Sequence, residues 1–218
     1  HAVRCAEDAL QGFVGDLVVL YGDSPLVPPS AIEDLYAALE TGAALGVLGF
    51  EAAEPGLYGR LILAADGDLD AIVEAREASP AQLAVRLCNS GVMTGRAETM
   101  FRLLAKVTNQ NAKGEYYLTD LVGLARAEGA ICKAVQCGED DLIGCDSKAD
   151  LARSGPMRAC GLAPCFSLMC ASAISSRRRT RRWAKVPRQT ISPIWVTAIS
   201  APMRISAPAR SSAIMMAS

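Results

Sequence analysis

The chain has 218 residues, is 51% hydrophobic and carries a formal net charge of −1 at pH 7, so it can bury one sizeable core or one domain plus an appendage. No apolar run approaches the ~20 residues that a bilayer-spanning helix needs, and the first five residues lack the basic-then-apolar layout of a signal peptide. We therefore expect no membrane association and a cytoplasmic location.

The charge is unevenly distributed. All 23 acidic residues precede Ser154, together with 12 of the 22 basic residues, so the remainder of the chain is purely basic. This asymmetry predicts a boundary near Arg153, with one domain at residues 1–153 and a basic tail at residues 154–218.

The eight cysteines are scattered along a chain with a large aliphatic content, which favours reduced thiols over a disulfide framework. Cys160, Cys165 and Cys170 recur every five residues, which is the one pattern that suggests a metal cluster. No CxxC pair occurs, however, and the only histidine is His1, so we do not expect a zinc site.

The first predicted elements alternate between helix and strand. Residues Ala2 to Leu10 predict a helix, and the uninterrupted apolar run Leu17–Tyr21 is typical of a buried parallel strand. Ser30 followed by Glu33 is the signature of a capping box at the start of a second helix, and Gly42 stands where that helix should end. A strand-helix-strand unit of this kind predicts an α/β fold with a mainly parallel sheet.

The following segments continue this plan with one insertion. Leu45–Phe50 predicts a strand, and the apolar segments on either side of Asp66-Gly67 predict an antiparallel ribbon. The remaining expected elements are a strand at Cys88–Met93, helices at Glu98–Lys106 and Leu118–Ala127, and a last strand at Ile131–Val135.

Asp23 is the sharpest single candidate for chemistry. It follows the strand Leu17–Tyr21 directly, and open α/β sheets bind ligands at the carboxyl ends of their strands. A carboxylate there suits Mg²⁺ held jointly by the protein and substrate phosphates. The alternative is that Gly22-Asp-Ser-Pro25 is only a turn, since these residue types favour turns.

Five segments occur in a specific order: Leu20-Tyr-Gly-Asp-Ser-Pro-Leu26, Tyr58-Gly-Arg60, Ala71-Ile-Val-Glu74, Cys88-Asn-Ser-Gly-Val92 and Asn111-Ala-Lys-Gly-Glu-Tyr-Tyr-Leu-Thr-Asp120. Their order and spacing resemble the uridylyltransferase domain of the bifunctional bacterial enzyme that makes UDP-N-acetylglucosamine. The resemblance covers essentially all of residues 1–153. It implies a Rossmann-like nucleotidyltransferase fold with a mixed, mainly parallel sheet and flanking helices.

The resemblance also implies a site. Asp23 would be the catalytic residue and a Mg²⁺ ligand, and Asp146 would be the second ligand, with Lys148 in place of the family's arginine. The residues implied to bind the nucleotide or the sugar are Tyr21, Gly22, Gly59, Glu74, Asn89, Tyr117 and Thr119. A purely structural role is the alternative for each of them: a turn at Gly59, a solvated strand end at Glu74, core packing at Tyr117.

The implied reaction joins UTP and N-acetylglucosamine 1-phosphate to give UDP-N-acetylglucosamine, a precursor of peptidoglycan and lipopolysaccharide, with Mg²⁺ as cofactor. The family's first strand and its glycine-rich loop, which carries an arginine and a lysine, have no counterpart here. Since nucleotidyl transfer depends on charge stabilisation around the phosphates, we expect an inactive fragment. The alternative is a nucleotide-sugar-binding remnant without catalysis.

The basic tail contains Arg177-Arg-Arg-Thr-Arg-Arg182, which superficially suggests nucleic-acid binding. Back-translating Gly155–Met216 with G/C-rich codons and reading one frame over gives a sequence that resembles the left-handed β-helix acetyltransferase half of the same enzyme. We therefore expect a frameshift-derived, irregular tail and no nucleic-acid partner. The intact family trimerises through that β-helix, so we expect no trimer contact here.

Overall fold

The computed structural model describes residues 3–21, 24, 27–111, 114–142, 195–199 and 212–217. The strands are β1 (Asp16–Tyr21), β2 (Leu45–Glu51), β3 (Arg60–Leu63), β4 (Leu69–Val73), β5 (Leu87–Arg96), β6 (Cys132–Cys137), β7 (Trp195–Ile199) and β8 (Ser212–Ala217). The α-helices are α1 (Pro29–Glu40), α2 (Pro80–Leu83), α3 (Ala97–Leu104) and α4 (Asp120–Ala127), and 3-10 turns lie at Val3–Ala6, Asp8–Leu10 and Glu139–Asp141. Within this part of the chain, no helix has the length and apolar character needed to cross a membrane.

These strands form one mixed sheet in the order β4-β3-β5-β1-β8-β7, with β2 pairing with β5 and β6 pairing with β2. The long strand β5 runs antiparallel to β1, β2 and β3, whereas β6 is parallel to β2 and β8 is parallel to β1. The expected α/β class with flanking helices is confirmed. As expected, most of the described strands run in the same direction as β1. Most hydrogen-bonded pairs among them are nevertheless antiparallel, because β5 lies between β1 and β2 and runs against both.

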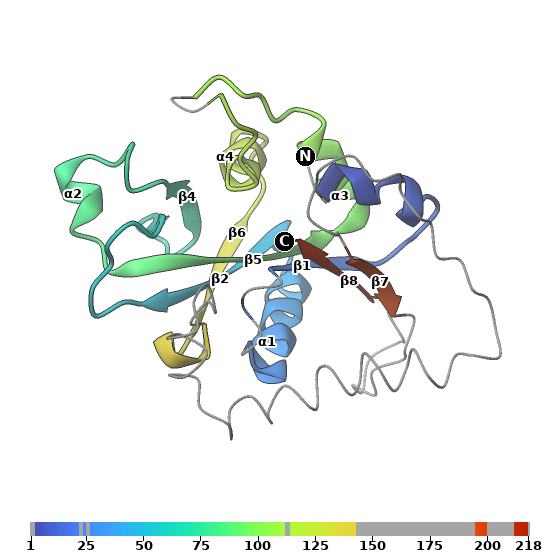
Figure 1. Cartoon of the computed structure of the whole chain (residues 1–218), viewed down its shortest axis with the longest axis horizontal. Coiled ribbons are helices and arrows are strands. Elements are labelled where there is room, and N and C mark those ends of the chain that lie inside the picture. The colour runs from blue at the N-terminus through green and yellow to red at the C-terminus, as the bar shows by residue number, and fades with distance from the viewer. Residues whose placement is uncertain are drawn as a thin grey trace.

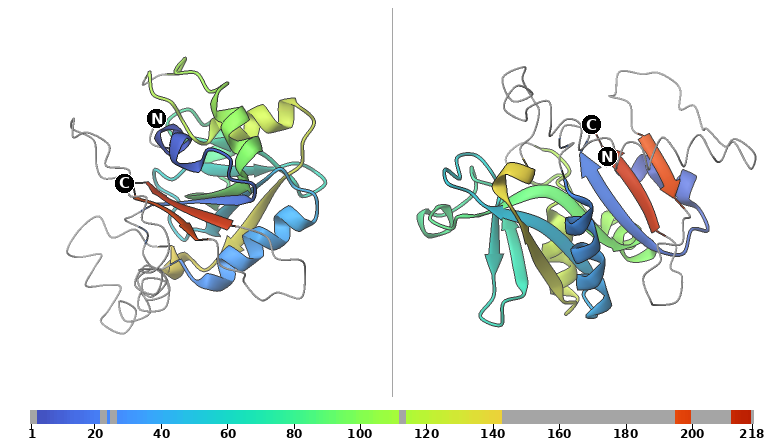
Figure 2. Two further views of the ribbon diagram at one scale, coloured as in Figure 1. Left: turned by 90° about the vertical axis from the view of Figure 1, so that its right-hand side faces the viewer. Right: turned by 90° about the horizontal axis from the view of Figure 1, so that it is seen from below.

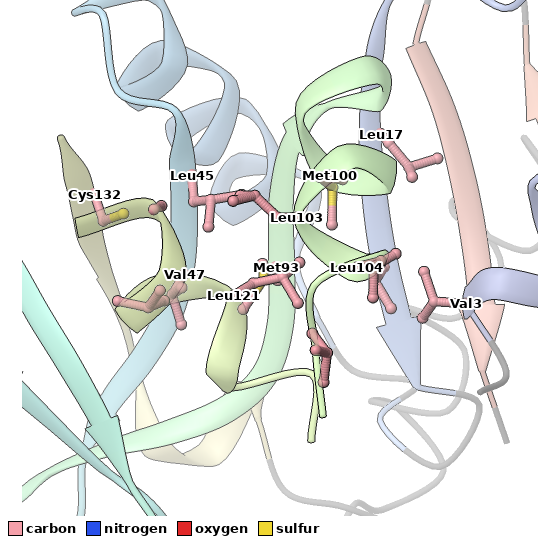
Figure 3. Packing of buried hydrophobic residues seen from close by; sticks show 14 of the residues in the cluster. Val3, Leu17, Leu45, Val47, Met93, Met100, Leu103, Leu104, Leu121 and Cys132 are labelled. Carbon is pink, nitrogen blue, oxygen red and sulfur yellow. The ribbon is translucent and has the colours of Figure 1, made fainter. Parts of the chain in front are cut away.

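Helices cover both faces of the sheet (Figure 1), with α1 on one side and α3 and α4 on the other. Alternate residues of β1 serve the two layers, as a strand buried on both faces requires. Val18 packs in the cluster that contains Leu35 of α1, while Leu17 packs in the cluster that contains Met100 and Leu103 of α3. Figure 3 shows this second cluster between the sheet and the α3–α4 layer.

The start of α1 differs from the sequence expectation, while its end agrees. Pro28 is the residue before the first helical turn and Pro29 opens it, with no side-chain cap hydrogen bond, so the capping box predicted at Ser30 is wrong. A proline at the first helical position has a fixed φ that suits the helix and lacks an N–H that would be unpaired anyway. Gly42 lies just beyond the last turn with φ of +97°, the conformation expected of a glycine that ends a helix.

The amino-terminal segment forms two 3-10 turns where we expected one helix. Val3, Ala6 and Leu10 are buried and contribute to the core under α3. Their spacings of three and four residues place all three side chains on the face of the segment that is turned toward the core.

The tail departs from the expected irregular structure at two places. The strand β8 pairs in parallel with β1 from Asp16↔Ser212 to Tyr21↔Ala217, and β7 pairs antiparallel with β8. Both views in Figure 2 show β8 beside β1. The edge of β1 that faces away from β5 can accept a further strand, and residues 212–217 contain no charged residue that would oppose pairing. The predicted boundary at Arg153 lies outside the described residues.

Candidate functional site

The candidate site lies where β1 and β2 end and β5 begins. Tyr21 is the last residue of β1, and Gly49 near the end of β2 lies opposite Asn89 near the start of β5. The amide of Ser24 donates to the carbonyl of Tyr21 at 3.1 Å, next to the end of β1. Open α/β sheets bind ligands at this edge, where strands end and loops begin.

Tyr21 and Gly91 are in close contact at this edge. Gly91 has φ of +87°, and a Cβ on it would lie 2.6 Å from Cε2 of the Tyr21 ring. The Gly91 N–H donates to Oδ1 of Asn89 at 3.0 Å, which fixes one end of the asparagine side chain. Only glycine therefore leaves room for the Tyr21 ring while holding Asn89 in this orientation.

Gly59 and Glu74 extend this set of contacts. The Asn89 N–H donates to the carbonyl of Gly59 at 2.8 Å. A Cβ on Gly59 would lie 3.6 Å from the Cβ of Asn89 and 3.7 Å from Oε1 of Glu74. Three separate segments, the loop before β3, the residue after β4 and the start of β5, thus bring an amide and a carboxylate beside the buried backbone of Gly59.

Glu74 is also linked to the segment before α4. The hydroxyl of Thr119 donates to Oε1 of Glu74 at 3.4 Å. Desolvation raises the pKa of Tyr117, and the nearby carboxylates, first Glu77 and then Glu115, Glu74 and Asp120, raise it further. The Tyr117 phenol therefore keeps its proton and can donate a hydrogen bond to a ligand.

The pKa of Asp120 is raised as well, by burial and then by the charge of Glu77. This carboxyl group is the first residue of α4, so it lies next to Thr119 in the chain. Negative charge on Glu77 and Asp120 near Tyr117 favours hydrogen-bond donors, such as sugar hydroxyls, over anions on this side of the site.

The structure thus brings together all the predicted nucleotide- and sugar-binding residues that it describes. They are Tyr21, Gly59, Glu74, Asn89, Tyr117 and Thr119, joined by the contacts above and by the electrostatic coupling of Tyr117 to Glu74. The predicted residues Gly22, Asp23, Asp146 and Lys148 lie outside the described residues. Among the residues that are described, no group of three or more His, Cys, Asp or Glu could hold a metal ion.

Sequence reasoning missed Gly91, which shapes this site. Gly91 lies within the segment Cys88–Val92, one of the motifs that carried the resemblance. Nothing in its residue type alone distinguished it, because its role depends on the position of the Tyr21 ring.

Sequence comparison identifies relatives. The chain is 75% identical over 154 residues to the Bifunctional protein GlmU of Hyphomonas neptunium, a match that covers 71% of this chain and 33% of that protein. It is 51% identical over 152 residues to the GlmU of Ruegeria pomeroyi and 50% identical over 154 residues to that of Maricaulis maris, covering 70% and 71% of this chain and 33% and 34% of those proteins. About 70% of this chain is homologous to part of GlmU.

The chain spans about a third of the length of these GlmU proteins. No family model matches it. The homologous stretch of 152 to 154 residues is long enough to include every segment that carries the site, from Tyr21 to Thr119. The resemblance inferred from five motifs is therefore confirmed.

Two solved structures show the fold. One is a putative glucose-1-phosphate thymidylyltransferase from Bacillus anthracis in complex with a sucrose, with a TM-score of 0.52 and 15% identity over 72% of this chain and 58% of that one. The other is CMP:2-keto-3-deoxy-manno-octonic acid synthetase complexed with CTP, with a TM-score of 0.51 and 15% identity over 73% of this chain and 67% of that one. The fold is thus the Rossmann-like one of nucleotidyltransferases.

Proposed function

We propose that this chain carries the substrate site of a uridylyltransferase that forms UDP-N-acetylglucosamine from UTP and N-acetylglucosamine 1-phosphate. The observation that carries the proposal is the connected set of contacts from Tyr21 through Asn89 and Gly59 to Glu74 and Thr119. The homology to GlmU over about 70% of the chain supports it. The product would be a cytoplasmic precursor for the synthesis of peptidoglycan and lipopolysaccharide.

The side chains suit a sugar that carries hydroxyl and acetamido groups. The Glu74 carboxylate accepts hydrogen bonds from hydroxyls, and the Asn89 side-chain amide group has donors left for an acetamido carbonyl while its Oδ1 accepts from Gly91. Gly59 is buried, and the absence of a side chain lets its backbone pack close to Asn89 and Glu74. Tyr21, at the end of β1, would border the nucleotide.

Mg²⁺ is the implied cofactor, and Asp23 and Asp146 would hold it. The chemistry of these donors fits, because carboxylate oxygens are the protein ligands that Mg²⁺ prefers and few are needed beside substrate phosphates. When bound, the ion would supply positive charge to the phosphates of UTP and to the departing pyrophosphate.

In the proposed reaction, a phosphate oxygen of N-acetylglucosamine 1-phosphate forms a bond to the α-phosphorus of UTP, and the bond from that phosphorus to pyrophosphate breaks. The residues described here bind and orient rather than exchange protons. Holding two reactants in line is itself a large part of catalysis in phosphoryl-type transfers. Glu74, Asn89 and Tyr117 would therefore act by fixing the sugar, and with it the attacking phosphate.

The test uses the full chain, Mg²⁺, UTP and N-acetylglucosamine 1-phosphate, with release of pyrophosphate as the measure of turnover. Calorimetric binding of UDP-N-acetylglucosamine is the second measurement. We expect Glu74→Gln to weaken binding of the sugar nucleotide by about tenfold, the cost of about one good hydrogen bond to a charged group. Any turnover that the unaltered chain shows should be abolished by Asp23→Ala. Glu40→Gln, at an exposed position at the end of α1, is the matched control and should change neither quantity.

The two measurements separate catalysis from binding alone. Binding that depends on Glu74 without any pyrophosphate release would favour the nucleotide-sugar-binding remnant. Unchanged binding in Glu74→Gln, or no binding of UDP-N-acetylglucosamine by the unaltered chain, would remove the proposed site.

A further inference from the structure

Arg60 is a charged residue in a position where charge is costly. It is the first residue of β3, and only 3% of its surface is exposed. No described carboxylate forms an ion pair with it. Burying an unpaired guanidinium is unfavourable unless its N–H groups are satisfied by other acceptors, so the acceptors that it does reach indicate its purpose.

The acceptors of Arg60 are three carbonyls of the loop that precedes it. Nη1 donates to the carbonyl of Pro55 at 3.3 Å and also to that of Tyr58, and Nη2 donates to the carbonyl of Gly56 at 3.1 Å. Nε is buried without a partner. The planar fork of arginine can reach several acceptors at fixed angles, which the single ammonium of lysine cannot do.

This loop has few other anchors near its end. Its beginning is held by Arg86, which donates to the carbonyl of Ala52 at 2.9 and 3.1 Å, and by Glu139, which accepts from the N–H of Ala53 at 3.1 Å. Further along, Leu57 is 77% exposed. The last residues of the loop therefore bury little apolar surface. The hydrogen bonds from Arg60, rather than hydrophobic contacts, hold this part of the loop in place.

Tyr58 is the exception, because its ring packs edge-on against Phe50 with the ring centroids 5.0 Å apart. Tyr58 is nevertheless 46% exposed. Its N–H donates to the carbonyl of Pro55 at 3.1 Å, and the same carbonyl accepts from Arg60. The aromatic contact and the hydrogen bonds of the guanidinium therefore both hold the loop end.

The held end of the loop leads directly into the candidate site. Gly59 follows Tyr58, and its carbonyl accepts the N–H of Asn89 at 2.8 Å. Arg60 itself lies opposite Cys88 in the β3–β5 pairing, so Gly59 and Asn89 are aligned immediately beyond the last paired residues. Any shift of the loop end would move Gly59 relative to Asn89 and Glu74.

We propose that Arg60 is a positioning residue for the sugar side of the site: it fixes the loop of residues 55–58 through its three carbonyls and so sets the spacing of Gly59, Asn89 and Glu74. The ligand named in this inference rests on the proposed function. The fixing of the loop by Arg60 does not depend on that function. Arg60 contacts no substrate; it acts through the backbone of Gly59.

The first experiment measures hydrogen exchange without any ligand, on the full chain and on Arg60→Met and Arg60→Lys. We expect the amides of Tyr58 and Asn89 to exchange about tenfold faster or more in Arg60→Met, since local opening is governed by the contacts that close a segment. The amide of Ala64, which donates to Asp68 in the turn after β3, should not change. Arg102→Met, which removes an exposed arginine from a surface ion pair, is the matched control.

Arg60→Lys keeps the charge but loses the fork, so we expect an intermediate increase in exchange at Tyr58. If Arg60→Met does not fold, the exchange rates of Arg60→Lys test the positioning role by themselves. Exchange at Tyr58 and Asn89 equal to that of the unaltered chain, in either folded variant, would overturn the positioning role.

The second experiment measures turnover or binding. Arg60→Met should raise the KM for N-acetylglucosamine 1-phosphate, or the Kd for UDP-N-acetylglucosamine where the chain binds without turnover, by about tenfold, because small displacements of a binding group are costly. The KM for UTP and kcat should stay within about twofold of the unaltered chain. An equal change for both substrates would show a general structural effect instead. Absence of ligand binding by the unaltered chain would refute the proposed function and not the loop role, which the exchange data decide alone.

Discussion

Gly91 shows how one residue without a side chain can determine a site. Its φ of +87° is strained for any other residue, and a Cβ there would lie 2.6 Å from the Tyr21 ring. Gly91→Ala should therefore combine a backbone cost with a steric one. We expect a loss of stability in denaturant unfolding that exceeds the backbone cost alone by about 1–3 kcal/mol, the usual range for overpacking.

Gly67→Ala is the control that isolates the steric part. Gly67 has a nearly equal φ of +85°, and a Cβ there would meet nothing within 4 Å. Only the backbone cost remains, about 1–2 kcal/mol for a left-handed conformation. Equal losses in the two variants would mean that the Tyr21 ring moves aside freely and does not depend on Gly91.

At the residue scale, sequence could predict the members of the site but not their geometry. Gly59, Glu74 and Asn89 stood in motifs with a specific order, and the structure places them side by side. The contribution of Arg60 could not be foreseen, since a buried arginine that binds three carbonyls of its own loop has no signature in residue type or spacing. Such roles depend on where the chain runs after it folds.

At the scale of the element, two serines carry the same sequence signature with different outcomes. Ser79 accepts from the N–H of Gln82 and the Gln82 side chain accepts from the N–H of Ser79, a complete capping box at α2. Ser30 lies inside α1 and makes no such cap. We expect Ser79→Ala to cost about 0.5–2 kcal/mol. Ser30→Ala should stay within about 0.5 kcal/mol of the unaltered chain.

Thermal or denaturant unfolding of the two variants measures the two losses of stability directly. Both serines are exposed, so a loss of buried surface does not contribute to either value. A Ser30→Ala variant that loses as much stability as Ser79→Ala would contradict the start of α1 at Pro29. The physical lesson is that a pattern of residue types marks a helix start only approximately. A nearby proline can open the helix earlier, and here Pro29 opens it two positions before the start that Ser30 predicted.

Strands with strong apolar runs were easier to predict than the way they pair. Sequence predicted the strands now seen as β1 and β2 within one residue of each end. It did not predict that β5 would run antiparallel between them, because a buried apolar run is compatible with either direction of pairing. Direction depends on how the ribbon of β3 and β4 and the short helix α2 return the chain to the sheet.

At the scale of the whole molecule, β1 joins the candidate site to the tail. One edge of β1 pairs with β5, which carries Asn89, and the other pairs with β8 over the six positions Asp16–Tyr21. This pairing was not expected, because a segment whose residues are not patterned to match a core was predicted to stay irregular. Backbone pairing with an available strand edge requires much less of a sequence than core packing does.

Removing β8 should therefore loosen the end of β1 that holds Tyr21. We expect Ile214→Pro, which removes a backbone donor from the middle of β8, and truncation after Ser211 to speed amide exchange in β1 by about tenfold or more, because β1 becomes an edge strand. The amides of β6, which pairs only with β2 among the described strands, serve as the internal control and should keep their rates. Faster exchange throughout both strands would indicate global destabilisation. Unchanged exchange in β1 would show that β8 contributes nothing to holding Tyr21, and the sheet would then have to be redrawn with β1 at its edge.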